Sequence, residues 1–387
     1  MRVKLKDIFE LQMGKTPSRN NSEYWNKKDY KWISIADLTK TGKYISDTKE
    51  FLSQKAVEES GIKVIPANTV VMSFKLSIGK IAITMENMYS NEAIMAFNDK
   101  HVMEILPEYI FYLFKYKNWD IGSNKAVMGK TLNKATLSEI EVEICPIEKQ
   151  KEIVNILNKV MLVLDSRKLE LQHLDELVNA RFVEMFGNPV ANDMGWNTLP
   201  LKNACKSIVD CPHSTPSYTN EDTGFMCIRT SIVKKNKIFW DDIEYIPEDE
   251  FVKRIQRKKP EVGDIVYTRE GAILGIAAII DRDCNVALGQ RSMLLSPDID
   301  KCTSEFLCVA MNSDSFLDNV LKGVSGSASP HINVGDIKVF RMIMPPVELQ
   351  KQFSDFVKQV NKSKVAIQKA LDKTQMLFDS LMQEYFG

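Results

Sequence analysis

An internal repeat constrains this chain more than any other feature, because a duplicated sequence predicts a duplicated fold. Pro146-Ile-Glu-Lys-Gln-Lys151 recurs as Pro346-Val-Glu-Leu-Gln-Lys351, and Glu184-Met-Phe-Gly187 recurs as Glu384-Tyr-Phe-Gly387. Both pairs are separated by 200 positions (346 − 146 and 387 − 187), so the last part of each half aligns without a gap. The sequence therefore predicts two copies of one scaffold.

Upstream of this alignment the two halves share only landmarks. Three segments correspond, Trp32-Ile-Ser-Ile35 with Phe225-Met-Cys-Ile228, Asn68-Thr-Val-Val71 with Gly263-Asp-Ile-Val266, and Ile78-Gly-Lys-Ile-Ala82 with Leu274-Gly-Ile-Ala-Ala278. The loops between these landmarks differ completely. Because loops on a rigid scaffold carry binding residues, two such copies are expected to contact different targets.

Each half begins with about 145 residues of short apolar runs separated by turn residues, a pattern that predicts strands. We expect strands at Tyr30–Ile35, Thr69–Phe74, Lys80–Met85 and Ile140–Cys145, and helices at Pro107–Lys117 and Thr303–Leu321. The expected product is a mixed, strand-dominated globular domain.

Each half then continues into a long helix that begins near Pro146 or Pro346, since proline is tolerated in a first turn. Apolar residues recur at spacings of three and four over about five heptads, which is typical of a coiled-coil seam. The predicted seam consists of Ile153, Leu157, Val160, Leu164, Leu171, Leu174, Val178 and Met185 in the first helix, and of Phe353, Val357, Val360, Ile367, Leu371, Phe378, Leu381 and Tyr385 in the second. A helix of about 36 residues would be about 54 Å long.

The fold class that follows is α+β, with two tandem mixed α/β domains separated by two long helices in a pseudo-twofold repeat. The expected segments are a first domain at 1–145, a first helix at 146–187, a linker at 188–195, a second domain at 196–345 and a second helix at 346–387. Because the linker is short, the helices are expected to form an antiparallel coiled coil, and Arg167 and Lys364 are expected to set its register.

Charge and cysteine content limit the classes of protein. The chain has 51 basic and 51 acidic residues, so its formal net charge is zero, unlike that of a non-specific nucleic-acid binder. If DNA is the ligand, charge must gather on one face or a partner must supply phosphate contacts. The seven scattered cysteines form no Cys-x-x-Cys pair, no long apolar run exists, and the N-terminus lacks an apolar leader, so a reducing cytoplasm is expected.

Motifs for catalysis are missing. Gly14-Lys-Thr16 and Gly129-Lys-Thr131 lack the glycine that a phosphate-binding loop needs five positions earlier. The chain has no glycine-rich methyl-donor loop, and Pro345-Pro346 does not sit in an Asn/Asp-Pro-Pro-aromatic motif. The four histidines form no metal-binding pattern. We therefore expect no catalytic residue and no metal site in this chain.

The motifs, in their duplicated order, resemble those of the DNA-specificity subunit of type I restriction-modification systems. Gly14-Lys-Thr-Pro-Ser18, followed by Tyr24-Trp25 and Trp32-Ile-Ser-Ile-Ala-Asp37, resembles the start of that family's target recognition domains. Gly263-Asp-Ile-Val-Tyr-Thr-Arg269 resembles its mid-domain motif, and Pro345-Pro-Val-Glu-Leu-Gln350 resembles the start of its conserved helix. The resemblance covers essentially the whole chain.

Three departures from the family pattern concern loop geometry. Cys145-Pro146 replaces a double proline, Ser73-Phe-Lys-Leu-Ser77 replaces a glycine-bearing turn, and His213-Ser-Thr-Pro-Ser217 replaces the Gly-x-Thr-Pro-Ser start in the second domain.

The resemblance implies a subunit that reads a bipartite, asymmetric site in double-stranded DNA, one half per domain, with the helices setting the gap. It implies two adenine methyltransferase subunits carrying S-adenosylmethionine, and ATP- and Mg-dependent restriction subunits, as partners; this chain would hold no cofactor and catalyse nothing. Alternatives are the specificity subunit of a related, type IIB-like system, a self-contained DNA-modifying enzyme, and a coiled-coil scaffold that binds only proteins.

Candidate DNA-contacting residues are polar and basic side chains in the predicted loops, since such side chains read base edges and phosphates. In the first domain they are Lys15, Thr16, Ser18, Arg19, Asn20, Asn21, Lys75, Ser77, Lys125 and Lys130. In the second they are His213, Ser214, Thr215, Ser217, Tyr218, Arg229, Arg269, Arg291 and Ser327, with Arg254, Arg257, Lys258 and Lys259 expected on phosphates. Trp25 and Trp32 are expected in the core.

Overall fold

The computed structural model describes residues 1–75, 77–119, 132–322 and 330–387. The chain divides into two compact units. Unit 1 consists of Met1–Ser166 and Ala370–Gly387, and unit 2 consists of Arg167–Lys369. Each unit therefore contains the first part of one long helix and the last part of the other.

Unit 1 is built on three small sheets. Its strands are β1 (Arg2–Lys4), β2 (Phe9–Met13), β3 (Tyr30–Ile33), β4 (Tyr44–Ile45), β5 (Glu50–Leu52), β6 (Val70–Ser73), β7 (Ile81–Thr84), β8 (Tyr89–Ser90), β9 (Ile94–Asp99) and β10 (Glu141–Glu143). Its shorter helices are α1 (Leu5–Ile8), η1 (Ser22–Tyr24), α2 (Ile35–Lys40), α3 (Gln54–Ser60), α4 (Pro107–Tyr116) and α5 (Lys134–Ser138). The sheets have the strand orders β2-β9-β6-β7-β4, β5-β3-β8 and β1-β10.

Unit 2 repeats this plan. Its strands are β11 (Thr198–Pro200), β12 (Cys205–Asp210), β13 (Met226–Ile228), β14 (Val233–Lys234), β15 (Lys237–Ile238), β16 (Glu244–Tyr245), β17 (Ile265–Thr268), β18 (Ala277–Ile279), β19 (Val286–Leu288), β20 (Ser292–Pro297) and β21 (Arg341–Ile343). Its shorter helices are α7 (Leu201–Ala204), η2 (Thr230–Ile232), η3 (Trp240–Asp242), α8 (Glu248–Arg254), α9 (Ser304–Asn312), α10 (Asp314–Lys322) and α11 (Val334–Val339).

The sheet orders of the two units confirm the predicted repeat. The order β2-β9-β6-β7 in unit 1 corresponds to β12-β20-β17-β18 in unit 2, and β5-β3-β8 corresponds to β16-β13-β19. The pairs β3–β8 and β13–β19 are both parallel, although most of the pairs around them are antiparallel. The landmark segments of the sequence contribute these equivalent strands, β3 with β13, β6 with β17, and β7 with β18.

One predicted element differs. The helix expected at Thr303–Leu321 is two helices, because Ser313 adopts an extended backbone (φ −61°, ψ 143°) between α9 and α10. The Ser313 hydroxyl accepts a hydrogen bond from the Phe316 N–H (3.3 Å), so this residue caps α10 as it ends α9. Serine favours such a cap over a helix interior because its side chain competes for backbone donors.

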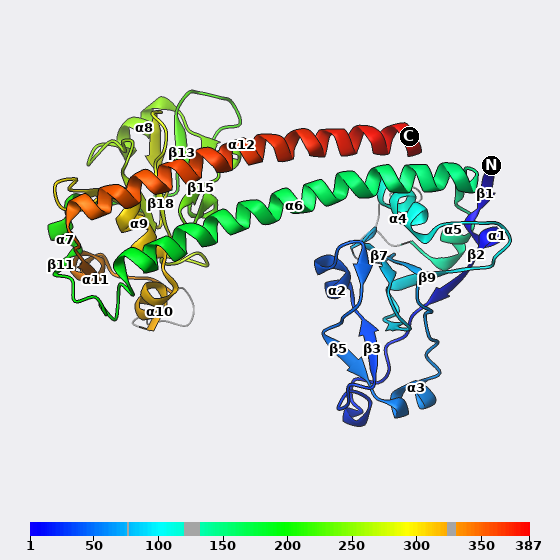
Figure 1. The fold of residues 1–387 in the computed structure, drawn as a ribbon. Helices are drawn as coiled ribbons and strands as arrows, with labels where there is room; N and C mark the ends of the chain where they lie inside the picture. The colour runs from blue at the N-terminus through cyan, green and yellow to red at the C-terminus, as the bar shows by residue number, and fades with distance from the viewer. Residues whose placement is uncertain (76, 120–131, 323–329) are drawn as a thin grey trace. The chain divides into compact units, whose positions relative to one another are not determined.

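The core of each unit lies between its main sheet and a long helix. In unit 1, α4 lies between the five-stranded sheet and α6 (Ile147–Phe186), as Figure 1 shows. In unit 2, α9 packs on β18, and Phe306 from α9 stacks on Phe182 of α6 (ring centroids 5.6 Å apart). The apolar residues of α4 and α9 are therefore buried on both sides, which explains why these segments are apolar almost throughout.

The two long helices, α6 and α12 (Val347–Phe386), have 40 residues each. Within unit 2 the end of α6 meets the start of α12 through Phe186 and Phe353 (5.4 Å), while Asp175 pairs with Lys364 further along. These two contacts mean that the helix segments of unit 2 run in opposite directions, and that Lys364 contributes to their register.

In unit 1 the Lys149 ammonium lies 5.9 Å from the Tyr385 ring, so the start of α6 lies beside the end of α12 there. Every residue of the predicted seam is buried or half-buried. The seam also includes Phe182, Phe186 and Met382, which the heptad pattern did not single out.

A glutamine at the start of each long helix joins that helix to its domain. Gln150 is completely buried; its Oε1 accepts from the Leu106 N–H (2.9 Å) and its Nε2 donates to the Glu104 (3.1 Å) and Cys145 (2.9 Å) carbonyls. These bonds fix the first turns of α6 to the segment that begins α4.

Gln350, 200 positions later, is also completely buried and makes the same three bonds. Its Oε1 accepts from the Thr303 N–H (3.0 Å), and its Nε2 donates to the Lys301 (3.1 Å) and Pro345 (2.8 Å) carbonyls. The repeated Glu-x-Gln sequence is therefore a repeated structural joint, which we call the glutamine joint.

We predict that Gln350→Ala lowers the free energy of unfolding by about 3 kcal/mol, because it leaves a buried N–H and two carbonyls without partners. Gln352→Ala is the matched control, since Gln352 is exposed on the same helix and its loss should cost about 0.5 kcal/mol or less. Urea unfolding followed by circular dichroism measures both. Equal effects of the two substitutions would contradict the role of the joint.

Candidate nucleic-acid interface

Strand register brings three loops of each unit together at one end of the main sheet. In unit 1, Met13 at the end of β2 pairs with Met95, and Ser73 at the end of β6 pairs with Ile94. In unit 2, Asp210 at the end of β12 pairs with Met293, and Thr268 at the end of β17 pairs with Ser292. The loops after β2 and β6 and before β9 therefore meet in unit 1. The loops after β12 and β17 and before β20 meet in unit 2.

We call this end of each sheet the loop edge. In unit 1 it comprises Gly14–Ser18, Lys75, Ser77 and Asn91–Ala93; in unit 2 it comprises Cys211–Ser217, Arg269–Leu274 and Gly289–Arg291. About half of the candidate DNA-contacting residues from the sequence lie on one of the two loop edges.

In unit 1 the loop edge brings Thr16 and Lys75 close to the acidic residue Glu92. The Thr16 hydroxyl donates to the Glu92 carboxylate, and the Lys15 ammonium donates to the Ser60 carbonyl. Burial alone would raise the pKa of Glu92, but the Thr16 hydrogen bond and the nearby Lys75 and Arg19 charges together hold it below its usual range. A fixed anion therefore lies among the candidate cations.

Arg19 is held by the domain itself. Its guanidinium makes two hydrogen bonds to the Glu50 carboxylate (2.5 and 3.1 Å) and lies 3.8 Å from the centre of the Trp25 ring. Asn21 caps η1, since its side chain accepts from the Glu23 N–H (3.1 Å). Ser18, Asn20 and Ser77 are exposed. Lys125 and Lys130 lie outside the described residues, as does the Gly129-Lys-Thr131 segment.

In unit 2, Arg269 is buried (5% exposed) and not available to a ligand. Its Nε donates to Asp210 (2.9 Å) and its Nη1 pairs with Glu270 (2.6 Å). Its Nη2 faces His213 Nδ1 (3.4 Å), while His213 Nε2 lies 3.1 Å from Asp210. Because an arginine can only donate, His213 Nδ1 accepts and Nε2 carries the proton. The imidazole is thus oriented, with its ring largely exposed.

Arg254 is also buried (6% exposed). Its Nε pairs with Glu250 (2.7 Å), and its Nη1 and Nη2 donate to the Leu288 (3.3 Å) and Ser214 (2.7 Å) carbonyls. The expectation that Arg254 binds a phosphate and that Arg269 reads a base is therefore corrected, because every nitrogen of both guanidinium groups has a partner inside the domain.

The other candidates of unit 2 remain at the surface. Arg257 donates to the Asp210 carbonyl (3.2 Å), Lys258 pairs with Glu261 (2.8 Å) and Asp264 (2.9 Å), and Lys259 donates to Asn285 (3.2 Å). Arg229 pairs with Glu244 (2.9 Å) and lies 5.5 Å from the Tyr218 ring. Ser214, Thr215, Ser217, Tyr218 and Arg291 are exposed. Ser327 lies outside the described residues.

Sequence reasoning missed the acidic partners of these cations, Glu92, Asp210 and Glu270. A search for DNA-contacting residues passes over carboxylates, yet Asp210 stands at a strand end directly before the candidate loop, a position that could have drawn attention to it. The core placement of Trp32 (2% exposed) is confirmed; Trp25 is half-buried and packs edge-to-face on it (5.1 Å).

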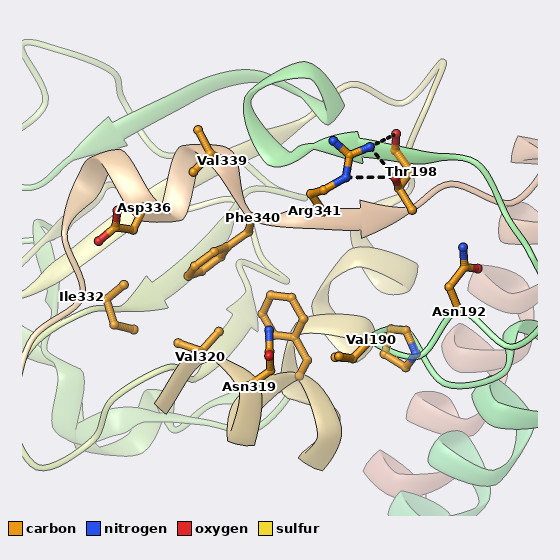
Figure 2. A pocket seen from close by; sticks show the side chains of 12 residues that line it. Val190, Asn192, Thr198, Asn319, Val320, Ile332, Asp336, Val339, Phe340 and Arg341 are labelled. Atoms are coloured by element: carbon orange, nitrogen blue, oxygen red, sulfur yellow. Dashed lines mark hydrogen bonds between the residues drawn. The ribbon is translucent and has the colours of Figure 1, made fainter. Parts of the chain in front are cut away.

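Unit 2 also contains a pocket of about 600 Å³, shown in Figure 2. Val320, Val339 and Phe340 form much of its apolar lining, and at its rim Arg341 donates from Nε to the Thr198 hydroxyl (3.1 Å). We assign this pocket no ligand.

The described ranges contain no group of three or more His, Cys, Asp or Glu side chains placed to hold a metal ion. In the same ranges, no helix combines the length and apolar character needed to cross a membrane. All seven cysteines are free, and burial raises the pKa of the Cys205 and Cys227 thiols to about 12.

Comparison with known families and structures gives consistent results. Residues 1–174 and 195–374 each match the family model described as "Type I restriction modification DNA specificity domain". The type I restriction enzyme MjaIX specificity subunit of Methanocaldococcus jannaschii is 24% identical, over 98% of this chain and 90% of that protein.

Two solved structures share the fold. The crystal structure of a type I restriction-modification S subunit from M. genitalium superposes with a TM-score of 0.55 at 13% identity, covering 100% of this chain and 96% of that one. A structure described as the basis of complex assembly and conformational transition of the type I R-M system gives a TM-score of 0.56 at 18% identity, covering 100% and 97%.

We predict that Arg269→Met lowers the free energy of unfolding by about 3 kcal/mol, because it leaves the half-buried Asp210 and Glu270 carboxylates without their buried cation. Arg229→Met should cost about 1 kcal/mol or less, since its pair with Glu244 is partly exposed to solvent, with side-chain exposures of 44% and 31%. Urea unfolding of the two variants makes the comparison. A loss for Arg269→Met no larger than that for Arg229→Met would show that the buried cluster is not structural.

Proposed function

Because this chain belongs to the family of type I restriction-modification DNA specificity domains and is a specificity subunit of that kind, we propose that it reads a bipartite, asymmetric site in double-stranded DNA. Each unit carries one recognition module and reads one half-site at its loop edge. The long helices set the gap between the half-sites. Two modules on one chain make the second binding event intramolecular, which raises the affinity for a site with the correct gap.

The observation that carries this proposal is one scaffold with two different loop edges. The sheet orders correspond strand by strand, whereas the side chains at the loop edges do not: unit 1 presents Lys15 and Lys75, and unit 2 presents His213, Ser214 and Arg291. A lysine and a histidine or serine present different donors to base edges. Two different half-sites require such a difference.

We infer that the chain catalyses no reaction itself and that partners supply the chemistry. Two adenine methyltransferase subunits would bring S-adenosylmethionine, and the restriction subunits would bring ATP and Mg. The charge balance supports this dependence, because the net charge is zero and Glu92 and Asp210 lie among the loop-edge cations. A DNA duplex is a polyanion, so partner subunits would have to supply much of the phosphate contact.

The long helices offer a repeated surface for two identical partners. Leu177 on α6 and Leu377 on α12, which are 200 positions apart, are 47% and 51% exposed. Leu162 (68%) and Leu169 (50%) extend the exposed apolar surface of α6. Exposed leucines at equivalent repeat positions fit the docking of two copies of one methyltransferase.

The functional segments that we propose are those predicted from the repeat. Residues 1–145 and 196–345 are the reading modules, 146–187 and 346–387 are the helical spacers, and 188–195 join the halves. We expect that replacing residues 1–145 with the equivalent module of another specificity subunit changes one half-site and leaves the other unchanged. The measurement is sequencing of methylated adenines in a host that expresses the chimaera with the methyltransferase. A change in both half-sites would contradict modular reading.

The spacer role has its own test. Inserting seven residues after Leu169 and seven after Lys369 adds a heptad at equivalent positions of both helices. At 1.5 Å per residue this adds about 10 Å of helix, which should lengthen the accepted gap by about three base pairs while both half-sites stay the same. Insertion into one helix alone is the control and should destabilise the protein, because the seams no longer match. An unchanged gap in the double insertion would contradict the spacer role.

Two alternatives predict different results in the same assays. A self-contained DNA-modifying enzyme would bind S-adenosylmethionine as the lone chain, whereas we expect methyl-donor binding only with the methyltransferase present, as measured by calorimetry. A specificity subunit of a related, type IIB-like system would read DNA in the same way but differ in the cleavage partner with which it purifies.

A further inference from the structure

The two loop edges contain one segment in common. Thr16-Pro17-Ser18 in unit 1 and Thr215-Pro216-Ser217 in unit 2 both follow the outer strand of the main sheet, β2 or β12. In both, the proline is buried and the serine is exposed. The two segments therefore sit on their scaffolds in the same way, and the residues just before them, Lys15 and Ser214, are equivalent.

In unit 1 two tryptophans hold this segment by its main chain. The Trp32 Nε1–H donates to the Lys15 carbonyl (3.1 Å), and the Trp25 Nε1–H donates to the Ser18 carbonyl (3.1 Å). The Lys15 N–H in turn donates to the Ser90 carbonyl at the end of β8 (2.8 Å). Both ends of the segment are thus fixed through their main-chain groups.

In unit 2 a buried arginine takes over this role. Arg254 Nη2 donates to the Ser214 carbonyl (2.7 Å), the equivalent of the Lys15 carbonyl. Arg254 Nη1 donates to the Leu288 carbonyl (3.3 Å), and Leu288 ends β19, the counterpart of β8. The arginine therefore bridges the loop and the strand that bond each other directly in unit 1.

The exchange has a steric reason. A Cβ on Gly14 would lie 2.2 Å from the Asn91 carbonyl oxygen, so only glycine allows the loop to approach β8 this closely. Cys211 stands at the equivalent position in unit 2, since its N–H donates to the Ser292 carbonyl (3.2 Å) as the Gly14 N–H donates to the Ile94 carbonyl (3.1 Å), and its Cβ excludes the same close approach. By strand register Cys227 lies where Trp32 lies in unit 1, because the next residue, Ile228 or Ile33, accepts from the Gly289 or Asn91 N–H, and Cys227 has no indole N–H to donate to the loop. In unit 2 the guanidinium of Arg254 therefore makes the bond to the loop carbonyl that Trp32 makes in unit 1.

We propose that Trp32 and Arg254 are positioning residues for DNA reading: each holds the carbonyl of Lys15 or Ser214, so that the Thr-Pro-Ser segment is presented to DNA in one conformation. Neither touches DNA. A loop that is ordered before binding loses no further conformational entropy when DNA binds, so no affinity is lost in ordering it. A rigid loop also cannot adjust its shape to accommodate a wrong base. This inference rests on the proposed function, and it names the segment that reads in each module.

The test uses the complete complex of this chain with its methyltransferase, and sequencing of methylated adenines in the host genome. Trp32→Phe keeps an aromatic ring but removes the N–H. It should raise methylation at sites with a mismatch in the first half-site by about fivefold, the equivalent of one hydrogen bond. The second half-site should keep its selectivity.

Trp119→Phe is the matched control. Trp119 is also a buried tryptophan of unit 1 whose Nε1–H donates to a main-chain carbonyl, that of Phe114 (2.8 Å) on α4. This substitution removes the same kind of bond from the core and should leave both half-sites as selective as in the unchanged complex.

Arg254→Lys provides an independent variant in the other unit. Lysine keeps the charge beside Glu250 but cannot bridge two carbonyls as a guanidinium does. It should relax the second half-site only. Parent-like selectivity in both Trp32→Phe and Arg254→Lys, or equal relaxation of both half-sites by either one, would overturn the proposal. Absence of any bipartite selectivity in the unchanged complex would instead refute the proposed function.

Discussion

The glutamine joint is the constraint on which the rest of the structure depends. A completely buried side-chain amide makes three main-chain hydrogen bonds at the start of each long helix. Two of the three tie that helix to the segment that leads into α4 or α9, and the third holds the residue just before Pro146 or Pro346. A buried amide that loses its partners is costly, so the helix cannot turn relative to its domain without losing them together. A spacer helix can fix a distance on DNA only if its junction with the reading module is rigid. The repeated glutamine supplies that rigidity twice, which accounts for the repeat of the helix start even though the loops have diverged.

The charge of several candidate DNA-contacting cations is compensated within the domain. Several cations that the sequence presents as candidate DNA contacts already bond a carboxylate, Arg19 with Glu50, Lys258 with Asp264, and Arg269 with Asp210. A protein that binds phosphates on its own leaves such cations free, since release of counterions drives the binding. This chain instead uses its ion pairs to shape loops. On the proposed function, this chain contributes selectivity to the complex, while partner subunits contribute most of the affinity. That division of labour agrees with a net charge of zero.

The sequence predicted periodic and repeated features well and tertiary ones poorly. The two long helices follow from heptad spacing, and the equivalence of the two sheets follows from landmarks such as Asn68-Thr-Val-Val71, because both signals are local. The burial of Arg269 depends on Asp210, which lies 59 positions away, and no local pattern reveals it. The ion pair of Arg254 could have been predicted from the sequence, since Glu250 lies four residues earlier on α8 and forms an i,i+4 pair with it. The break between α9 and α10 arises because the Ser313 side chain caps α10. The spacing of apolar residues does not reveal whether a serine caps a helix or lies inside one.

The exchange between the two units shows what has to change when such a module acquires a new specificity. Cys211 replaces Gly14 at the loop, Cys227 replaces Trp32 on the supporting strand, and Arg254 reaches the loop from α8. The residue at the first position cannot change alone, because a Cβ on Gly14 would lie 2.2 Å from the Asn91 carbonyl oxygen. The loop and the side chain that holds it therefore differ together between the two units, whereas each long helix meets its domain through the same glutamine joint. The two halves accordingly align without a gap in the helices and share only isolated landmarks in the modules.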